Sequence, residues 1–361
     1  MRFSVVLPTF NRRATLELVL AAWERQTPSD LAFELVVVDD GSSDGSAELL
    51  ASLRPERYAL RFARQENSGP AAARNRAIGL ASGDYLLFTG DDIEPAPDLL
   101  ARHLAAHQQH HQVGRAILGL TRWPEGLPQT ATMRHIDGVG AQQFSYLYLE
   151  DGAVYDFRHF YTSNVSIARD FLRHEPALFS RAFPAAAFED AELAHRLAFH
   201  GLEILYRRDA VAFHHHPYGA RSFYRRQQCC GQMAARLAHL HPSLEKWLST
   251  EELRCRRLEL IGQPRPAFEL ARERERAIEI AETWDAVDPP GIDELLLALF
   301  RFAYLDGLAH ALFGAAADKV LASYFRELLP PAIRAFERRL ATVGGALPLA
   351  DLLTFARHAA L

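Results

Sequence analysis

The sequence predicts an α/β fold, with a mostly parallel sheet flanked by helices and an all-helical region after it. Two observations support this prediction. Up to about residue 120, short apolar runs alternate with helical segments, which is the pattern of β-α-β units. Beyond residue 217, strand patterns nearly vanish and apolar residues recur with the helical period. We therefore predict two domains, residues 1–217 and residues 218–361.

Strands and helices alternate in the first part of the chain. The strands are expected in RFSVVLP, FELVVVDD, YALRFAR, DYLLFTG and RAILGL. Helices are expected between them, in ATLELVLAAWERQ, GSAELLASL, GPAAARNRAIGLA and APDLLARHLAAHQ. Each has helix-period apolar positions and a Ser, Thr, Gly or Pro near its start, as helix N-termini often do. Residues 121–160 are less regular and could form a substrate-facing insertion.

Regular patterns return after residue 160. YTSNVSIARDFL predicts a strand leading into a helix, FEDAELAHRLAFHG a helix closed by Gly201, and AVAFHHHP a strand stopped by proline. The helices of the second domain are expected at 221–240, 243–261, 267–285, 292–313, 315–329 and 331–341. Prolines and glycines separate several of these segments.

Composition excludes several classes of protein. A net charge of -5 and a pI near 6.4 give no global basic field, so no nucleic-acid partner is predicted. The cysteines at 229, 230 and 255 form neither a disulfide framework nor a spaced zinc site, which fits the cytoplasm. Charged residues interrupt the apolar stretch 295–317, which predicts a buried or interface helix pair and no transmembrane span. Without a strong basic amphipathic face, peripheral contact with the inner face of a membrane is only an option.

Acidic residues stand at two predicted strand ends, where ligands bind in open α/β sheets. Asp91 and Asp92 follow one strand, and adjacent carboxylates repel by roughly 4 kcal/mol at 4 Å in an effective dielectric near 20. A fold that fixes them there calls for a cation or a polar ligand. Asp39 ends another strand and could accept a hydrogen bond from the ring N–H of a uracil-type base. Structural turn and cap roles are predicted for Ser42, Ser43 and Asp44.

Basic residues add further candidates. Arg74 lies in the first turns of a predicted helix, where a guanidinium suits a diphosphate or base carbonyl, although a surface role is an equal alternative. In FHHHP, His214 and His216 share one face of a strand, and His215 lies on the other and is expected to have a packing or surface role. The histidines of HQQHHQ at 107–112 lack ligand spacing and are expected at the surface.

Six motifs occur in the order and rough spacing found in one enzyme family. They are VVLPTFNR, VVVDDGSSD, NSGPAAARNRAIGLASGDYLLFTGDD, YTSNVSIAR, FEDAELAHRLAFHG and AVAFHHHP. Over about residues 1–217 the chain thereby resembles family 2 glycosyltransferases, which have the Rossmann-like GT-A fold. The resemblance implies an inverting enzyme that moves a sugar from a nucleotide diphosphate, UDP- or dTDP-linked, to an acceptor hydroxyl. The acceptor would be a carbohydrate, a lipid-linked sugar or a protein, in polysaccharide, glycolipid or glycoprotein biosynthesis.

The resemblance also assigns roles to residues. The implied donor-binding residues are Pro8, Thr9, Asn11, Asp39, Arg74, Asp91 and Asn164. Asp91 would bind the ribose, and Asp92 would bind a divalent metal, Mn²⁺ or Mg²⁺, that bridges the diphosphate. His214 would complete the metal shell, with His216 as the alternative. The chain departs from the family at Gly90, where a third carboxylate is common.

The ED motif supplies the implied catalytic residues. Asp190 matches the general base that takes the proton of the acceptor hydroxyl, and Glu189 is its neighbour. For Glu192 we expect a structural role, because acidic residues stabilise helix N-termini.

Two other functions compete with this interpretation. A catalytically silent nucleotide-sugar-binding or scaffold protein would share the fold, but Asp92 and Asp190 are both present. A nucleotidyltransferase would need a glycine-rich nucleotide loop, and PTFNRRATLE has no glycine. The helices of 218–361 could recruit the acceptor, form a homo-oligomer or contact a membrane.

Overall fold

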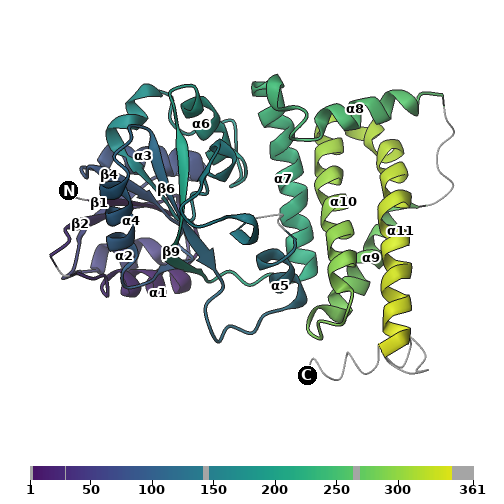
Figure 1. Ribbon diagram of the computed structural model, residues 1–361, viewed down its shortest axis with the longest axis horizontal. Coiled ribbons are helices and arrows are strands. Elements are labelled where there is room, and N and C mark those ends of the chain that lie inside the picture. The colour runs from purple at the N-terminus through teal and green to yellow at the C-terminus, as the bar shows by residue number, and fades with distance from the viewer. Residues whose placement is uncertain (1–2, 29, 141–145, 263–268, 344–361) are drawn as a thin grey trace. The chain divides into compact units, whose positions relative to one another are not determined.

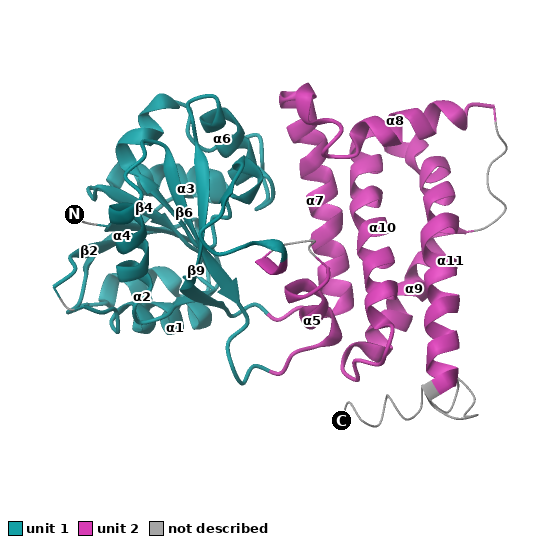
Figure 2. Ribbon diagram, in the orientation of Figure 1, with its two compact units in different colours: residues 1–127, 148–216 teal, residues 128–147, 217–361 magenta. Residues whose placement is uncertain are grey.

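The computed structural model contains two compact units. It describes residues 3–28, 30–140, 146–262 and 269–343. Unit 1 consists of residues 1–127 and 148–216, and unit 2 of residues 128–147 and 217–361 (Figure 2). The predicted folding boundary after residue 217 stays a prediction. The segment 128–147, which we expected in the first domain, groups with the helices instead.

Unit 1 is built on a mixed sheet. In the described residues nine strands form one sheet, in the order β3-β2-β1-β4-β8-β6-β9-β5 with β7 beside β9. Figure 1 labels β1, β2, β4, β6 and β9 among them. The strands are Phe3–Thr9 (β1), Phe33–Asp39 (β2), Ala59–Arg64 (β3), Tyr85–Phe88 (β4), Ile93–Pro95 (β5), Arg115–Arg122 (β6), Val154–Tyr155 (β7), Val165–Ala168 (β8) and Glu203–His214 (β9). Strands β1 to β4 pair with one another in parallel, and β6 pairs with β9 in parallel. Strands β5, β7 and β8 run antiparallel to the strands with which they pair. This confirms the α/β class.

Helices surround the sheet as predicted. They are Arg13–Trp23 (α1), Ser46–Ser52 (α2), Pro70–Leu80 (α3), Leu99–Gln109 (α4) and Glu189–Ala198 (α6). Alternate residues of a strand face opposite sides. Phe3, Val5 and Leu7 of β1 therefore join one apolar cluster with residues of α1, α2 and α4. Helix α3 packs on β1 and β2 with buried small residues, among them Ala73 and Ala77.

A crevice is expected at the carboxyl end of β1. Its neighbours are β2 on one side and β4 on the other, so the strand order reverses there, and such switch points bind ligands. β2 pairs with β1 as far as Thr9, but β4 pairs only as far as Val6. The last residues of β1, including Pro8, therefore have no β4 partner and border the space where the strands diverge.

Several boundaries differ from the sequence prediction. The two short strands β5 and β7 were not predicted, because three- and two-residue pairings leave little pattern in a sequence. The predicted helix after β8 is a 3-10 helix, Arg169–His174 (η3). Gly201 has φ of 90° and ends α6 as expected, because glycine readily adopts this left-handed conformation.

Unit 2 is helical. Its helices are Ala131–Asp137 (α5), Ala220–Leu240 (α7), Thr250–Glu259 (α8), Leu270–Asp285 (α9), Ile292–Phe313 (α10) and Ala317–Val343 (α11). Buried Asp285 accepts hydrogen bonds from the backbone N–H groups of Thr132, at 2.7 Å, and Ala220, at 2.9 Å. One carboxylate thus satisfies orphan donors at the N-termini of both α5 and α7. This contact ties the segment 128–147 to the C-terminal helices.

The predicted helix break near residue 330 is wrong. Helix α11 continues through Pro330 and Pro331, although each proline removes a backbone hydrogen bond. Leu329 and Phe336 on either side are buried, so packing keeps both halves of the helix in line. Tertiary packing overrides the local preference here.

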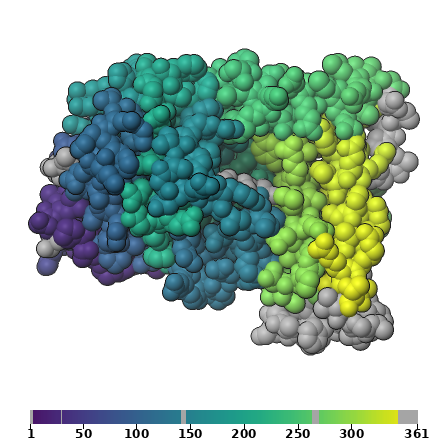
Figure 3. Space-filling view, viewed as in Figure 1, coloured from purple at the N-terminus to yellow at the C-terminus, as the bar shows by residue number. Residues whose placement is uncertain are grey.

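One helical stretch, Ile292–Thr342, is long and apolar enough to cross a membrane by length and composition. Of its most apolar window, 61% is buried inside the structure. Helix α10 packs against α7 and α11, and Figure 3 shows α10 (light green) and α11 (yellow) side by side. The stretch is thus weak evidence for a span and fits the predicted buried helix pair.

A glycine contact between α7 and α10 can be tested. A Cβ at Gly307 would lie 1.9 Å from the carbonyl oxygen of Gln228, whereas a Cβ at Gly79 in α3 meets nothing within 4 Å. Gly307→Ala should force the helices apart and cost about 1–3 kcal/mol. Gly79→Ala should stabilise the protein by about 0.5–1 kcal/mol, because alanine favours helix. Thermal melting of both variants checks this, and shifts in the same direction would contradict it.

Candidate functional site

The carboxylate pair follows β4, beside the carboxyl end of β1. Thr9 Oγ1 donates a hydrogen bond to Asp91 Oδ2 at 2.7 Å, and Arg12 Nη1 donates to Asp92 Oδ2 at 2.9 Å. Burial and then the charge of Asp92 raise the pKa of Asp91 above its usual range. The segment after β1 thus supplies a cation to the pair. Arg12 was missed in the sequence, where its place in VVLPTFNR, directly after the strand end, was the available signal.

Both candidate histidines face the same carboxylate. Nε2 of His214 lies 3.5 Å, and Nδ1 of His216 3.8 Å, from Asp92 Oδ2. Burial would raise the pKa of Asp92, but His214, Arg12 and His216 together lower it. The two metal-ligand alternatives therefore stay open. His215 binds Glu94 at 2.7 Å instead, which fits its predicted place on the opposite face.

The residues at Asp92 fit a divalent metal only in part. Among the described residues, no three of His, Cys, Asp and Glu gather as a ready-made metal site. Asp92 and His214 together offer one carboxylate oxygen and one imidazole nitrogen, which are ligands of first-row metals such as Mn²⁺. Further ligands would have to come from a bound diphosphate. Arg12 holds the same oxygen of Asp92, so a metal there would compete with its guanidinium.

Asp39 keeps an unused acceptor. It is fully buried, and its Oδ1 accepts the Ser42 N–H at 2.9 Å. No described residue donates a hydrogen bond to Oδ2, and Nε of Arg64 lies 3.3 Å away.

Asn11 links the loops that follow β1 and β2, since its N–H donates to Ser42 Oγ and its Oδ1 accepts the Ser43 N–H. The serines thus take the turn roles predicted for them.

The adjacent Asp40 has a separate, structural function that the sequence did not reveal. Its Oδ1 accepts the Ser68 N–H at 3.0 Å, and its Oδ2 accepts the Gly69 N–H at 2.8 Å. Asp40 therefore fixes the loop that leads into α3. Successive strand residues point to opposite sides, so the two aspartates serve different elements.

Arg74 is a buried residue, so the alternative of a surface role is wrong. Its Nη1 donates to Glu189 Oε1 at 2.6 Å. Burial and then the charge of Glu189 raise the pKa of Asp190 above its usual range. The guanidinium of Arg74 thus contacts the ED motif, and its implied donor contact stays a prediction. Glu192 pairs with Arg196, in agreement with its structural assignment.

Asp190 borders the edge of the sheet that carries the carboxylate pair. Its Oδ2 lies 3.4 Å from Thr162 Oγ1. In the antiparallel pair of β4 and β8, Val165 stands opposite Phe88. The residues just before Val165 therefore lie beside those just after Phe88, which lead to Asp91. The strand register brings the two acidic motifs to one edge.

Asn164 does not reach this edge with its amide. The side chain is buried, its Oδ1 is bonded to His103 Nε2 at 2.9 Å, and its Nδ2 donates to the Ala210 carbonyl at 2.9 Å. A donor contact through this amide would require these bonds to break, and the implied donor role stays a prediction. His107 was expected at the surface, which is wrong, because it is buried and bonded to Ser166 Oγ at 2.8 Å.

The fold and the site define an α/β unit with acidic residues at the carboxyl ends of its strands, and comparisons with known proteins relate part of it to one family. Residues 4–138 match the family model described as glycosyl transferase family 2. The glycosyltransferase YfnE of Bacillus subtilis is 28% identical over 62% of this chain and 67% of its own length. Validoxylamine A glucosyltransferase of Streptomyces hygroscopicus subsp. limoneus is 32% identical over 57% of this chain, and the match spans half of its length, 50%.

A solved structure supports the fold. S. aureus TarS, residues 1–349 in complex with UDP, superposes with a TM-score of 0.51 at 18% identity, covering 91% of this chain and 92% of that one. Residues 4–138 thus match a family 2 glycosyltransferase domain within a unit of the GT-A fold, and this match and the named relatives support an enzyme of the transferase class.

Nucleotide binding should depend on a metal through Asp92. With Mn²⁺, calorimetry should show UDP binding at least about 10-fold more tightly to the wild type, because a bridging cation screens the repulsion between diphosphate and carboxylates. Asp92→Ala should lose this gain. Asp170→Ala serves as the control, since its side chain is 75% exposed in the same unit. Equal affinities with and without Mn²⁺ in all three proteins would contradict the assignment.

Proposed function

We propose that the chain is an inverting, metal-assisted glycosyltransferase that moves a sugar from a UDP- or dTDP-linked donor to an acceptor hydroxyl. The supporting observation is the strand register that brings Asp190 to the edge of the carboxylate pair Asp91 and Asp92. A donor diphosphate at the pair would then place its sugar toward Asp190. The helices of residues 218–361 would serve acceptor binding, oligomerisation or a partner.

The choice of nucleotide rests on Asp39. Its Oδ2 can still accept a hydrogen bond, and the N3–H of uracil or thymine is a suitable donor. Cytosine has no hydrogen at N3 and would present an acceptor to this carboxylate. Relatives do not decide the acceptor, because one is named for the small molecule validoxylamine A.

The transfer step needs a base on the acceptor side. The acceptor O–H gives its proton to the Asp190 carboxylate while its oxygen bonds to the anomeric carbon of the sugar. The bond from that carbon to the diphosphate oxygen breaks on the opposite face, and the electron pair leaves with the diphosphate, so the configuration inverts. The raised pKa of Asp190 makes it a better proton acceptor than an ordinary aspartate.

Charge on the leaving group also needs compensation. Asp92 with His214 or His216 would hold the metal, which when bound would neutralise charge on the diphosphate. Arg12, whose guanidinium lies 2.9 Å from Asp92, would add a second positive charge and hydrogen-bond donors for the diphosphate.

A screen for donor hydrolysis tests the proposal. UDP-glucose, UDP-N-acetylglucosamine and dTDP-glucose are incubated with Mn²⁺ or Mg²⁺, with GDP-mannose and CDP-glucose as contrasts, and water serves as acceptor. Early NMR spectra should show the released sugar in the anomeric configuration opposite to that of the donor. Tight UDP binding without hydrolysis of any donor, and without transfer to offered sugars, would favour the silent binding protein instead.

Replacing the base should separate turnover from donor binding. Asp190→Asn should lower turnover by about 10²–10⁴-fold, the usual contribution of a positioned base, and change UDP affinity by less than about twofold. As the pH is lowered, wild-type turnover should begin to fall at a higher pH than it would with an aspartate of ordinary pKa. The reason is that the base must be deprotonated to act, and the pKa of Asp190 is raised. Single-turnover rates and calorimetry check this, with Asp170→Asn as control. Near-normal turnover would remove Asp190 as the base.

A further inference from the structure

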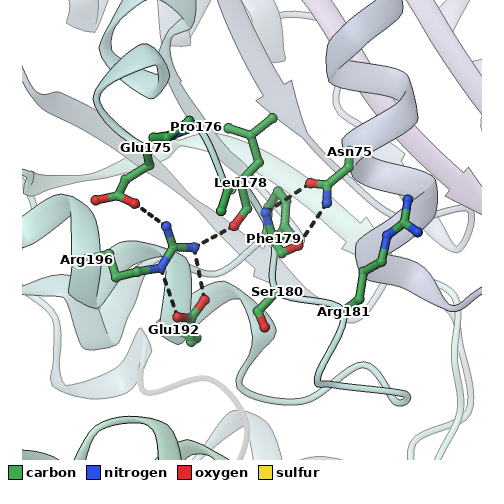
Figure 4. Close-up of a pocket in the computed structure, with 10 residues that line it drawn as sticks. Asn75, Glu175, Pro176, Leu178, Phe179, Ser180, Arg181, Glu192 and Arg196 are labelled. Carbon is green, nitrogen blue, oxygen red and sulfur yellow. Dashed lines mark hydrogen bonds and ion pairs between the residues drawn. The ribbon is translucent and has the colours of Figure 1, made fainter.

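The loop of residues 175–188 connects η3 to α6 and ends at the ED motif. Its residues line a pocket of about 520 Å³ together with residues of α3 and α6 (Figure 4). Polar groups in the pocket wall, notably those of Asn75, Glu175 and Arg196, are bonded to the loop or to each other. The polar side chains of the pocket wall therefore hold the loop in place.

Arg196 fastens the start of the loop to α6. Its guanidinium binds Glu192 in bidentate fashion at 2.8 and 3.0 Å and also contacts Glu175 and the Leu178 carbonyl (Figure 4). The side chains of Arg196, Glu175 and Glu192 are only 19%, 16% and 5% exposed. Such a shielded network holds geometry better than surface ion pairs do.

Asn75 fastens the middle of the loop to α3. Its Nδ2 donates to the Phe179 carbonyl at 2.8 Å, and its Oδ1 accepts the Phe179 N–H at 2.9 Å (Figure 4). Both backbone groups of Phe179 are thus paired with one amide, which only asparagine or glutamine can provide. The position of Phe179 is fixed from both sides.

Phe179 in turn supports the ED motif. Its buried ring packs edge-on against Phe88 of β4 and lies under the guanidinium of Arg74, 5.4 Å from its centre. Arg74 binds Glu189, the residue beside Asp190. Contacts therefore run without a gap from Asn75 through Phe179 and Arg74 to the ED motif.

We propose that Asn75 is a positioning residue that acts through Phe179 and the Arg74–Glu189 pair on the orientation of Asp190. This inference rests on the proposed function, in which Asp190 is the base. Asn75 does not hold the donor, and a displaced base costs rate because misplacement by about 1 Å can lower turnover 10²-fold.

A double-mutant cycle tests the proposal, using hydrolysis of the sugar nucleotide that the donor screen selects. Asn75→Ala should lower turnover about 10-fold to 100-fold and change UDP affinity by less than about twofold. In the Asp190→Asn background it should cause no further loss, because the group it positions is already removed. Arg181→Ala, which alters an exposed residue of the same pocket, should leave both quantities unchanged.

Each outcome decides the matter. Three results would overturn the inference while Asp190 remains the base. The turnover losses of Asn75→Ala and Asp190→Asn could multiply in the double variant, or Asn75→Ala could lower UDP affinity as much as turnover. Arg181→Ala could also lower turnover as much as Asn75→Ala does. Near-normal hydrolysis by Asp190→Asn would instead remove both the base assignment and the inference. Melting curves verify folding, and Asn75→Asp, which keeps the acceptor for the Phe179 N–H but lacks the donor, replaces Asn75→Ala if that variant is unfolded.

Discussion

The repulsion between the adjacent carboxylates Asp91 and Asp92 is the constraint on which the site depends. Relief comes from segments that are far apart in sequence: the hydroxyl of Thr9, the guanidinium of Arg12 and the imidazole of His214. These groups can meet only if β1 and β9 end beside the loop after β4. The strand order places β1 next to β4, and the pairing of β5 with β9 brings His214 alongside. Topology and electrostatics therefore specify the same arrangement.

The ED motif repeats this arrangement. In each adjacent pair, one carboxylate is bound by an arginine and the other has a raised pKa: Arg12 binds Asp92, and Arg74 binds Glu189. Asp91 and Asp190 are the members with raised pKa values. Environments that separate the pKa values of neighbouring acids assign them different tasks. One member of each pair is held in place, and the other is the one whose protonation responds near neutral pH.

Sequence patterns predicted the strand ends and the acidic motifs, because hydrophobic periodicity and motif order are local signals. They did not predict that Asp40 binds the loop before α3, nor that the amide of Asn164 is bonded inside the sheet, because both depend on which neighbour a side chain reaches. Arg12 was missed for the same reason. The continuation of α11 through Pro330 shows packing overriding a local rule. What could not be predicted was thus the set of contacts between distant segments.

The division of the chain follows from one such contact. The backbone leaves the sheet unit after residue 127, returns at 148 and leaves again after 216, so three chain crossings join the two units. Asp285, at the end of α9, accepts a hydrogen bond from the N-terminus of α5 in the first excursion. That excursion lies between β6 and β8 in the sequence, and its buried Thr132 N–H donates to Asp285 of α9. Residues 128–147 thus belong with the C-terminal helices through this contact, although they precede residue 217 in the sequence.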